Sequence, residues 1–308
     1  MPPRKPKRTD EFRLKLPATS ANLGPAFDAA ALALSFSLKI SAKPATEFSI
    51  RARGRDAEIC GDLDHHLILT TYREILMGEH RAVTPLSLQI ENQIPIGKGC
   101  GSSAAARLAG IAMADHFGQL RWSGNRIVGE AARREHHPDN AAACWMGGLA
   151  IARMSRDGEA QIARVTPKGN WPLLLAVPEQ SLATEEARRV LPNQYSRADV
   201  VNNIQNSMLL VAAFTQGQHD LLSAALVDRV HQPYRSELCP LLEALQPLTG
   251  SRGVLGVVLS GAGPSVLIFL DSKTSRAETK KYITEHLRSR KLVAELIATA
   301  ISNDGVIR

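Results

Sequence analysis

Three glycines at alternate positions and two serines mark the segment Pro95-Ile-Gly-Lys-Gly-Cys-Gly-Ser-Ser-Ala-Ala-Ala106. Glycines let the backbone approach a ligand closely, and the free amides that open a helix can hold phosphate oxygens. Ser102 and Ser103 would add hydroxyl groups, and Lys98 a mobile positive charge. The spacing follows neither the Walker nor the Rossmann glycine pattern. It predicts a phosphate-binding loop, and the alternative is a tight strand-to-helix connection, which usually needs only one glycine.

Five further segments carry polar residues suited to a small ligand. They are Pro17-Ala-Thr-Ser-Ala-Asn-Leu-Gly-Pro-Ala-Phe-Asp28, His137-Pro-Asp-Asn140, Thr184-Glu-Glu-Ala-Arg-Arg-Val-Leu-Pro192, His231-Gln-Pro-Tyr-Arg235 and Leu259-Ser-Gly-Ala-Gly-Pro-Ser-Val266. The Asp28 carboxylate can pair with an ammonium group, and the Asn22 amide can bond either end of a zwitterion. Arg188 and Arg235 offer planar forks that suit a carboxylate. Taken singly, such residues are more often solvated surface charges.

The phosphate-binding loop, the segment 17–28 and the segment 259–266 resemble the three motifs of the GHMP kinases, a family of small-molecule ATP-dependent kinases. Cys100 stands where that family usually has leucine. The resemblance implies an α+β protein of two domains, with the active site in the cleft between them. The first, residues 1–163, would be like domain 2 of ribosomal protein S5. The second, residues 164–308, would be a ferredoxin-like α/β sandwich.

The segments 137–140, 184–192 and 231–235, together with Gly147-Gly148, are similar to segments of the homoserine kinases within this family. The resemblance implies ATP- and Mg²⁺-dependent phosphorylation of the side-chain hydroxyl of L-homoserine, a step of threonine biosynthesis. It also implies a homodimer. With Lys98, Arg188 and Arg235 assigned to small anionic ligands, we expect neither a nucleic acid nor a membrane as partner. The alternatives are another GHMP kinase, of the mevalonate or sugar type, and a catalytically silent ligand sensor with the same fold.

The resemblance further implies a role for each site residue. The substrate would contact Asn22, Asp28, His137, Arg188 and Arg235. The nucleotide would contact Pro95, Ile96, Gly97, Lys98, Gly99, Cys100, Gly101, Ser102, Ser103, Ala104, Ala105 and His66. Glu130 and Ser103 would bind Mg²⁺, and Glu135 is a neighbouring candidate.

Asn140 and His137 would orient the attacking hydroxyl, whose proton can pass to the phosphate itself. Asp139 is the rival base, although we interpret it as the cap of the following helix because aspartate is favoured there. Ala26 and Ala30 replace residues usual in the first motif, which could reshape the substrate pocket. His66 is either a substitute hydrogen-bonding group for the adenine or an ordinary helix residue.

Alternating strands and helices must position these residues. Hydrophobic periodicity predicts strands at 12–16, 32–40, 48–52, 86–91, 149–154, 171–177, 254–259 and 266–270. It predicts helices at 62–76, 102–117, 124–134, 138–145, 199–214 and 276–290. A polar stretch at 155–170 marks the expected domain boundary.

The composition is that of an ordinary globular protein, since 44% of the 308 residues are hydrophobic and 22% are charged. No run of 18 apolar residues suggests a membrane span. Residues 1–13 contribute +3 to the net charge of +7, and we interpret them as a frayed tail, with a nucleic-acid-binding arm as the alternative. The four cysteines lack metal-site or disulfide spacing, which indicates a reducing cytoplasm.

Overall fold

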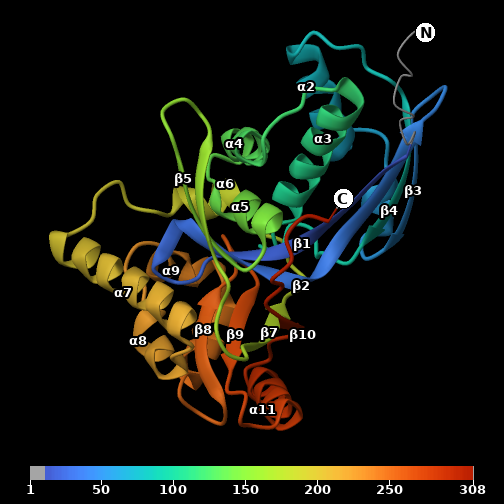
Figure 1. Cartoon of the computed structure of the whole chain (residues 1–308). Coiled ribbons are helices and arrows are strands. Elements are labelled where there is room, and N and C mark those ends of the chain that lie inside the picture. Colours follow the sequence, from blue (N-terminus) through green and yellow to red (C-terminus); the bar gives the residue numbers. More distant parts are fainter. Residues whose placement is uncertain (1–10, 308) are drawn as a thin grey trace.

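The computed structural model describes residues 11–307 and contains two sheets (Figure 1). The first sheet is built from β1 (Phe12–Asn22), β2 (Ala26–Pro44), β3 (Ser49–Gly54), β4 (Leu86–Asn92), β5 (Leu149–Met154) and β6 (Ala160–Val165). Its strand order is β3-β4-β2-β5-β6, and β1 pairs with β2. The 19-residue strand β2 joins the sheet together, because it pairs with β4 at one end and with β5 at the other.

Helices cover one face of this sheet. They are α1 (Ala57–Gly61), α2 (Leu67–Gly78), α3 (Ser102–Gly118), α4 (Gly124–Glu135) and α5 (Asp139–Met146). The small side chains of α3 let it pack very closely on α2. A Cβ at Gly110 would lie only 2.5 Å from the carbonyl oxygen of Ile68. This packing fixes the N-terminal end of α3, where the phosphate-binding loop ends.

The second sheet contains β7 (Pro172–Val177), β8 (Val254–Leu259), β9 (Val266–Leu270) and β10 (Glu295–Ala300). Its order, β10-β7-β9-β8, places the fourth strand beside the first and the third beside the second, as in a ferredoxin-like sandwich. One face packs on α10 (Pro240–Leu245) and α11 (Arg276–Ser289), and the other packs toward the first sheet and α7 (Arg197–Gln216). Because both faces are covered, every residue of β7 is buried.

Shorter helices connect β7 to β8 and supply residues of the site. They are α6 (Thr184–Arg189), α8 (Leu222–Ala225) and α9 (Gln232–Arg235), with 3-10 turns at His219–Leu221, Ser236–Leu238 and Gln246–Leu248. Among the described helices, none combines the length and the hydropathy that crossing a membrane requires.

A single hydrophobic core joins the two sheets. It includes Leu173 and Phe269 from the second sheet together with most buried residues of the first. After β10 the chain returns to the first sheet, where Ile307 forms a β-bridge with Lys15. The predicted division between residues 163 and 164 falls inside β6, and the division into two domains stays a prediction.

Most predicted elements are confirmed, including β8 and β9 at their predicted ends. Several details differ from the prediction, and the short helices α1, α6, α8, α9 and α10 are among the elements that the sequence did not predict. The polar stretch 155–170 contains the edge strand β6, and the predicted helix 62–76 starts only at Leu67. Strand β10 was not predicted at all, because its residues are partly exposed and follow a long charged helix without a clear alternation.

Candidate active site

The phosphate-binding loop connects β4 to α3 with its glycines in the left-handed region. The φ values are +69° at Gly97, +74° at Gly99 and +71° at Gly101. A Cβ at Gly99 would lie 2.1 Å from the carbonyl oxygen of Ser260, and one at Gly101 would lie 1.9 Å from Thr19 Oγ1. The loop therefore needs glycine twice over, for its conformation and for its close contact with the first and third motifs.

Two adjoining cavities meet at this loop. A cavity of about 110 Å³ contains the polar residues of the predicted site, and a more apolar cavity of about 520 Å³ lies beside it. Gly97, Ser102 and Ser103 line both cavities. A molecule with a phosphate chain at the loop could therefore reach into both.

The larger cavity is lined by His66, which directly precedes α2. Its Nε2 lies 3.1 Å from the carbonyl oxygen of Cys60, whereas its buried Nδ1 has no hydrogen-bond partner within residues 11–307. Burial lowers the pKa of His66, so the ring is neutral at pH 7. A neutral ring with an unpartnered nitrogen at the wall of an apolar cavity is compatible with hydrogen bonding to a nucleotide base after the ring turns.

Asn22 ends β1 and Asp28 is the third residue of β2, and both have positive φ. Asn22 Nδ2 donates to the carbonyl oxygen of Gly261 (2.8 Å), and its Oδ1 accepts from the backbone N–H of Asp28 (2.9 Å). Asn22 thereby ties the first motif to the third. Both residues line the small cavity, as predicted for a substrate site.

Arg188 and Asp28 form a bidentate ion pair at the small cavity. Arg188 Nη1 and Nη2 donate to the two carboxylate oxygens of Asp28 at 2.9 and 2.7 Å. From the sequence, Asp28 is expected to bind the ammonium group of a zwitterion and Arg188 its carboxylate. In this structure each is instead the partner of the other.

Arg235 is 1% exposed and also lines the small cavity. It donates to the carbonyl oxygen of Ala187 (2.9 Å) and, through Nη1, to Nδ1 of His231 (3.2 Å). Burial and the nearby Arg188 cation lower the pKa of Arg235 to about 10, so it stays charged at pH 7. Both guanidinium groups lie beside the Phe27 ring, at 5.5 Å for Arg188 and 5.3 Å for Arg235.

His231 is a positioning residue that the sequence interpretation did not assign, although it lies in a segment already singled out. Burial lowers its pKa to about 4, which leaves the ring neutral. Its Nε2 then donates to the carbonyl oxygen of Gly24 (2.8 Å), and its Nδ1 accepts from Arg235. The ring thus connects the buried arginine to the first motif.

His137, Asp139 and Asn140 form a connected group at the start of α5. His137 Nδ1 and the backbone N–H of Asn140 each lie 2.6 Å from Asp139 Oδ1. Asn140 Oδ1 accepts from the Thr19 hydroxyl (2.6 Å). The side-chain nitrogen of Asn140 therefore points away from Thr19. Burial disfavours the charged form of His137, but the hydrogen bond and charge of Asp139 outweigh it and raise the His137 pKa.

Asp139 is not the helix cap that the sequence predicted. It is the first residue of α5, it is 1% exposed, and the cap position is occupied by Pro138. Its carboxylate instead holds His137 and Asn140 in place. Asp28, His137 and Asp139 also bring one potential ligand atom each to within 4.8 Å of one another.

Glu135 takes the position that the sequence interpretation gave to Glu130. Glu135 lines the small cavity, and its Oε1 accepts from the Ser103 hydroxyl (2.6 Å) and from Arg107 (2.5 Å). Glu130 is not among the lining residues and is paired with Arg133 and Arg134. Glu135 and not Glu130 therefore lies at the loop, because five residues along α4 turn the side chain about 140° around the helix axis, and which of the two binds Mg²⁺ stays a prediction.

The remaining loop residues divide by position. Gly97, Gly99, Cys100, Gly101, Ser102, Ser103 and Ala104 line the small cavity, and Ile96 lines the larger one. Pro95 and Ala105 line neither, and the ammonium group of Lys98 donates to the carbonyl oxygen of Glu179 instead of facing a cavity. Burial raises the pKa of the Cys100 thiol to about 12, so this thiol is unreactive at pH 7.

Comparisons with known proteins identify the family of this chain. Residues 66–148 match the GHMP kinases N terminal domain, and residues 210–289 match the family described as GHMP kinases C terminal. The homoserine kinase of Solibacter usitatus is 44% identical over 84% of this chain and 85% of its own length. That of Synechococcus sp. is 36% identical over 96% of this chain and 97% of its own length.

A crystal structure of the homoserine kinase from Cytophaga hutchinsonii has the same fold, with a TM-score of 0.80, 22% identity and 97% of both chains covered. The family assignment itself depends on the sequence relatives, because their identities lie above 30% over most of both chains. The chain therefore belongs to the homoserine kinases of the GHMP kinase family.

Proposed function

We propose that this protein transfers the γ-phosphoryl group of ATP to the side-chain hydroxyl of L-homoserine, giving O-phospho-L-homoserine and ADP. One observation carries the proposal. The glycine-rich loop at the N-terminus of α3 lines the same small cavity as Asp28, Arg188 and Arg235. A phosphate site and a site for an amino-acid zwitterion thus lie side by side, and the curated relatives are named homoserine kinases.

Substrate recognition follows from the charges of the small cavity. Before the substrate binds, Asp28 neutralises Arg188. An amino acid can replace this pair with two new ones, its ammonium group on Asp28 and its carboxylate on the guanidinium groups of Arg188 and Arg235. After the exchange every charged group faces an opposite charge, and one positive charge of the two arginines stays in excess, which favours a zwitterion over a neutral sugar.

Phosphoryl transfer needs positioning and charge neutralisation more than a strong base. The amides at the start of α3 and the hydroxyl of Ser102 would hold the phosphate oxygens. The Asn140 amide nitrogen, oriented by Thr19 and Asp139, would donate to the attacking hydroxyl oxygen. The raised pKa of the neighbouring His137 favours its charged ring. A charged His137 would stabilise the negative charge that develops on the phosphoryl oxygens.

Mg²⁺ fits the residues at the edge of the cavity. The Ser103 hydroxyl and the Glu135 carboxylate are 2.6 Å apart, and both are hard oxygen ligands of the kind that Mg²⁺ prefers. When bound there with ATP, Mg²⁺ would neutralise charge on the phosphate oxygens. Arg107 holds the Glu135 carboxylate in position for this role.

The outward side of α7 supports a homodimer. Residues 200–216 contain no charged side chain, and Val201, Ile204 and Met208 are 46%, 53% and 70% exposed. The inward side packs Leu210, Ala213 and Phe214 into the core. It also carries Asn203 and Ser207, which donate to the carbonyl oxygen of Pro25 in the first motif. An uncharged apolar stripe on a long surface helix is typical of an interface core, and it is complementary to a second copy of itself.

A coupled assay of ADP release with L-homoserine, mevalonate and galactose tests the activity, with ³¹P NMR to identify the phosphorylated product. We expect turnover with homoserine and at least 100-fold lower kcat/KM with the other two. Turnover only with mevalonate or a sugar would assign a sibling activity. ATP binding without any phosphorylated product would indicate a ligand sensor.

A further inference from the structure

The outer face of the strands β1 to β4 is strongly basic. Along these strands the inward residues are apolar and pack under α2 and α3, while eleven outward residues are all polar or charged. They are Arg13, Lys15, Lys39, Ser41, Lys43, Ser49, Arg51, Arg53, Ser87, Gln89 and Glu91. Six are cations and one is an anion. We call these eleven residues the outer face.

The charge of the described chain is concentrated on this face. Residues 11–307 hold 32 lysines and arginines against 29 acidic residues, so those outside the outer face number 26 against 28. The outer face alone carries +5, while the rest of residues 11–307 is close to neutral. The ten residues that precede Glu11 in the sequence add four cations and one acid.

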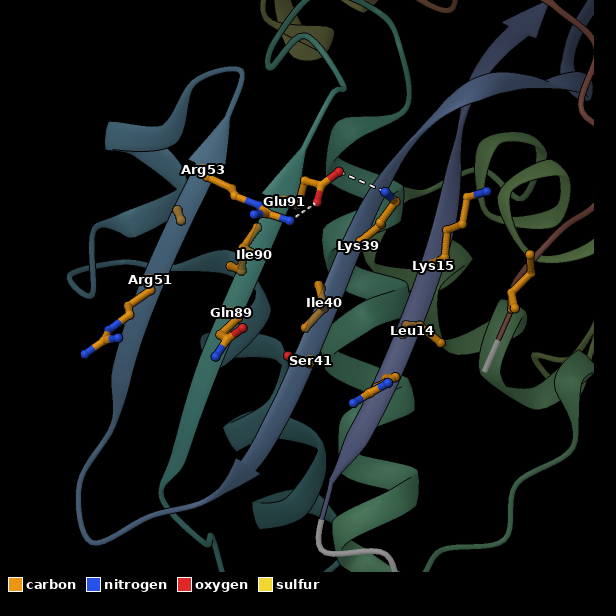
Figure 2. Close-up of a pocket in the computed structure, with 13 residues that line it drawn as sticks. Leu14, Lys15, Lys39, Ile40, Ser41, Arg51, Arg53, Gln89, Ile90 and Glu91 are labelled. Carbon is orange, nitrogen blue, oxygen red and sulfur yellow. Dashed lines mark hydrogen bonds and ion pairs between the residues drawn. The ribbon is translucent and has the colours of Figure 1, made fainter.

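Strand register sets the cations in rows. One row runs Lys15, Lys39, Glu91, Arg53 across β1, β2, β4 and β3, and Figure 2 shows these four side chains beside one another. The next row runs Arg13, Ser41, Gln89, Arg51. A hollow of about 750 Å³ lies over both rows. The face is thus a shallow surface with regularly spaced hydrogen-bond donors.

Acidic side chains neutralise only part of this array. Glu91 accepts from Lys39 at 2.8 Å and from Arg53 at 2.5 Å, as the dashed lines in Figure 2 show. Lys15, Lys43 and Arg51 have no ion pair within residues 11–307. Lys15 lies directly opposite Lys39, and like charges at such a position destabilise a sheet. This repulsion would be relieved by a partner with several negative charges.

The side-chain types select among anionic partners. The eleven residues of the outer face include no aromatic or large aliphatic side chain, and among the other residues that line the hollow only Ile307, beside Lys15, is an exposed large hydrophobic residue. One isoleucine at the edge does not supply the apolar centre that a folded protein partner requires or the groups that insert into a membrane. Serine and glutamine donors between the cations suit the oxygens of a phosphodiester chain. The lack of aromatic rings also excludes base stacking of the kind that selects sequence on a sheet.

We propose that the outer face of β1 to β4 binds the phosphodiester backbone of a nucleic acid without selecting bases. None of its charged residues lines the two cavities of the kinase site. Nucleic acid and the kinase substrates would therefore occupy the protein together, and neither would displace the other.

Fluorescence anisotropy with a labelled 20-nucleotide single-stranded RNA tests the proposal on the full chain. We expect binding at 50 mM salt that weakens about 50-fold at 200 mM, as contact with about four or five phosphates requires. The triple variant K15Q/K43Q/R51Q should bind at least about 10-fold more weakly and show a shallower salt dependence. A 20-nucleotide RNA with a scrambled sequence should bind with the same affinity as the first RNA.

A matched variant, K273Q/R276Q/K280Q, removes two lysines and one arginine from the exposed segment at the start of α11. It should bind RNA like the unaltered chain, and both triple variants should keep the rate of ADP formation. An equal loss of RNA affinity in both variants would show that only the net charge of the protein matters, and it would overturn the proposal.

Two further results would also overturn it. The first is that poly-glutamate or phosphatidylserine vesicles bind as tightly as RNA and that K15Q/K43Q/R51Q loses this binding. The partner would then be another polyanion and not a nucleic acid. A chain lacking residues 2–10 that no longer binds RNA, while K15Q/K43Q/R51Q binds normally, would move the site to the N-terminal segment.

Discussion

At the scale of single residues, the site depends on polar groups that hold one another in place. Asp139 fixes both His137 and Asn140, and Thr19 fixes the other side of Asn140. His231 holds Arg235 against the first motif. These groups are hydrogen-bonded, and all of them are buried except Asn140, which is half-buried. Removing the partner of a buried group leaves an unpaired polar atom, which costs about 1–3 kcal/mol.

Substituting the two candidate metal ligands one at a time separates their roles. Glu135→Gln removes a carboxylate from the cavity, so we expect kcat/KM to fall at least about 100-fold, with a higher Mg²⁺ concentration needed for half-maximal rate. Glu130→Gln removes only ion pairs with Arg133 and Arg134, which contribute about 0–1 kcal/mol to stability. Steady-state kinetics across a Mg²⁺ titration measures both. A larger loss in Glu130→Gln would restore the interpretation made from sequence.

The raised pKa of His137 predicts a pH-dependent contribution to stability. Because the folded protein holds this proton more tightly than the unfolded chain, the contribution is complete below the unfolded pKa of about 6.5 and is lost as the pH rises through the folded pKa. Asp139→Asn should remove it, with a loss of about 2 kcal/mol at pH 5.5 and less at pH 8.5. Urea unfolding of both proteins at the two pH values measures the difference, and a constant difference would contradict the prediction.

At the scale of elements, the phosphate-binding loop is held from both ends of the sequence. Ser260 Oγ donates to the Gly99 carbonyl oxygen (2.7 Å), and the Thr19 backbone N–H donates to the Cys100 carbonyl oxygen (3.1 Å). The turn after β8 and the strand β1 thus set the position of the loop that opens α3. The three family motifs are one packed unit, although Asn22 of the first and Gly261 of the last are 239 positions apart.

Gly99→Ala tests this packing. The left-handed backbone costs an alanine about 1–2 kcal/mol, and the new Cβ would meet the carbonyl oxygens of Ser260 and Gly263 at 2.1 and 2.7 Å. With about 1–3 kcal/mol for this overlap, we expect a total loss of about 3 kcal/mol and a higher KM for ATP. Gly250→Ala is the matched control, since its φ is +83° and nothing lies within 4 Å of its Cβ. Thermal unfolding should show the larger loss in Gly99→Ala, and equal losses would contradict the close contact.

At the scale of the whole molecule, α7 connects the substrate motif to the surface. Its inward amide and hydroxyl groups hold the chain at Pro25, close to Phe27 and Asp28, while its outward side is apolar. An ordinary surface helix exposes its polar side to water, whereas α7 exposes Val201, Ile204 and Met208. A second copy packed on the stripe would therefore support the substrate site from behind.

Met208→Lys places a charge in the centre of this stripe. We expect light scattering after size exclusion to show a dimer for the unaltered chain and a monomer, or at least a 100-fold weaker dimer, for the variant. Met77→Lys is the matched control, because Met77 is 67% exposed on α2 and Met208 is 70% exposed on α7. A monomer for the unaltered chain, or the same change in both variants, would rule out this interface.

The sequence by itself was enough for the parts of this protein that depend on local rules. Alternation and helical periodicity located most strands and helices, and the glycine spacing located the phosphate-binding loop. The motif order led to the family, which the sequence relatives confirm. It also led to the residues that line the small cavity, from Asn22 and Asp28 to Arg235.

Only the tertiary structure decided which neighbouring side chains meet. Glu130 and Glu135 lie on one helix and are chemically identical, so only the packing of α4 shows which carboxylate reaches Ser103. The Asp28–Arg188 pair joins residues 160 positions apart, and the basic rows of the outer face arise from the register of four strands. Sequence patterns report local conformation, whereas these contacts depend on how distant elements pack, and the sequence does not state that directly.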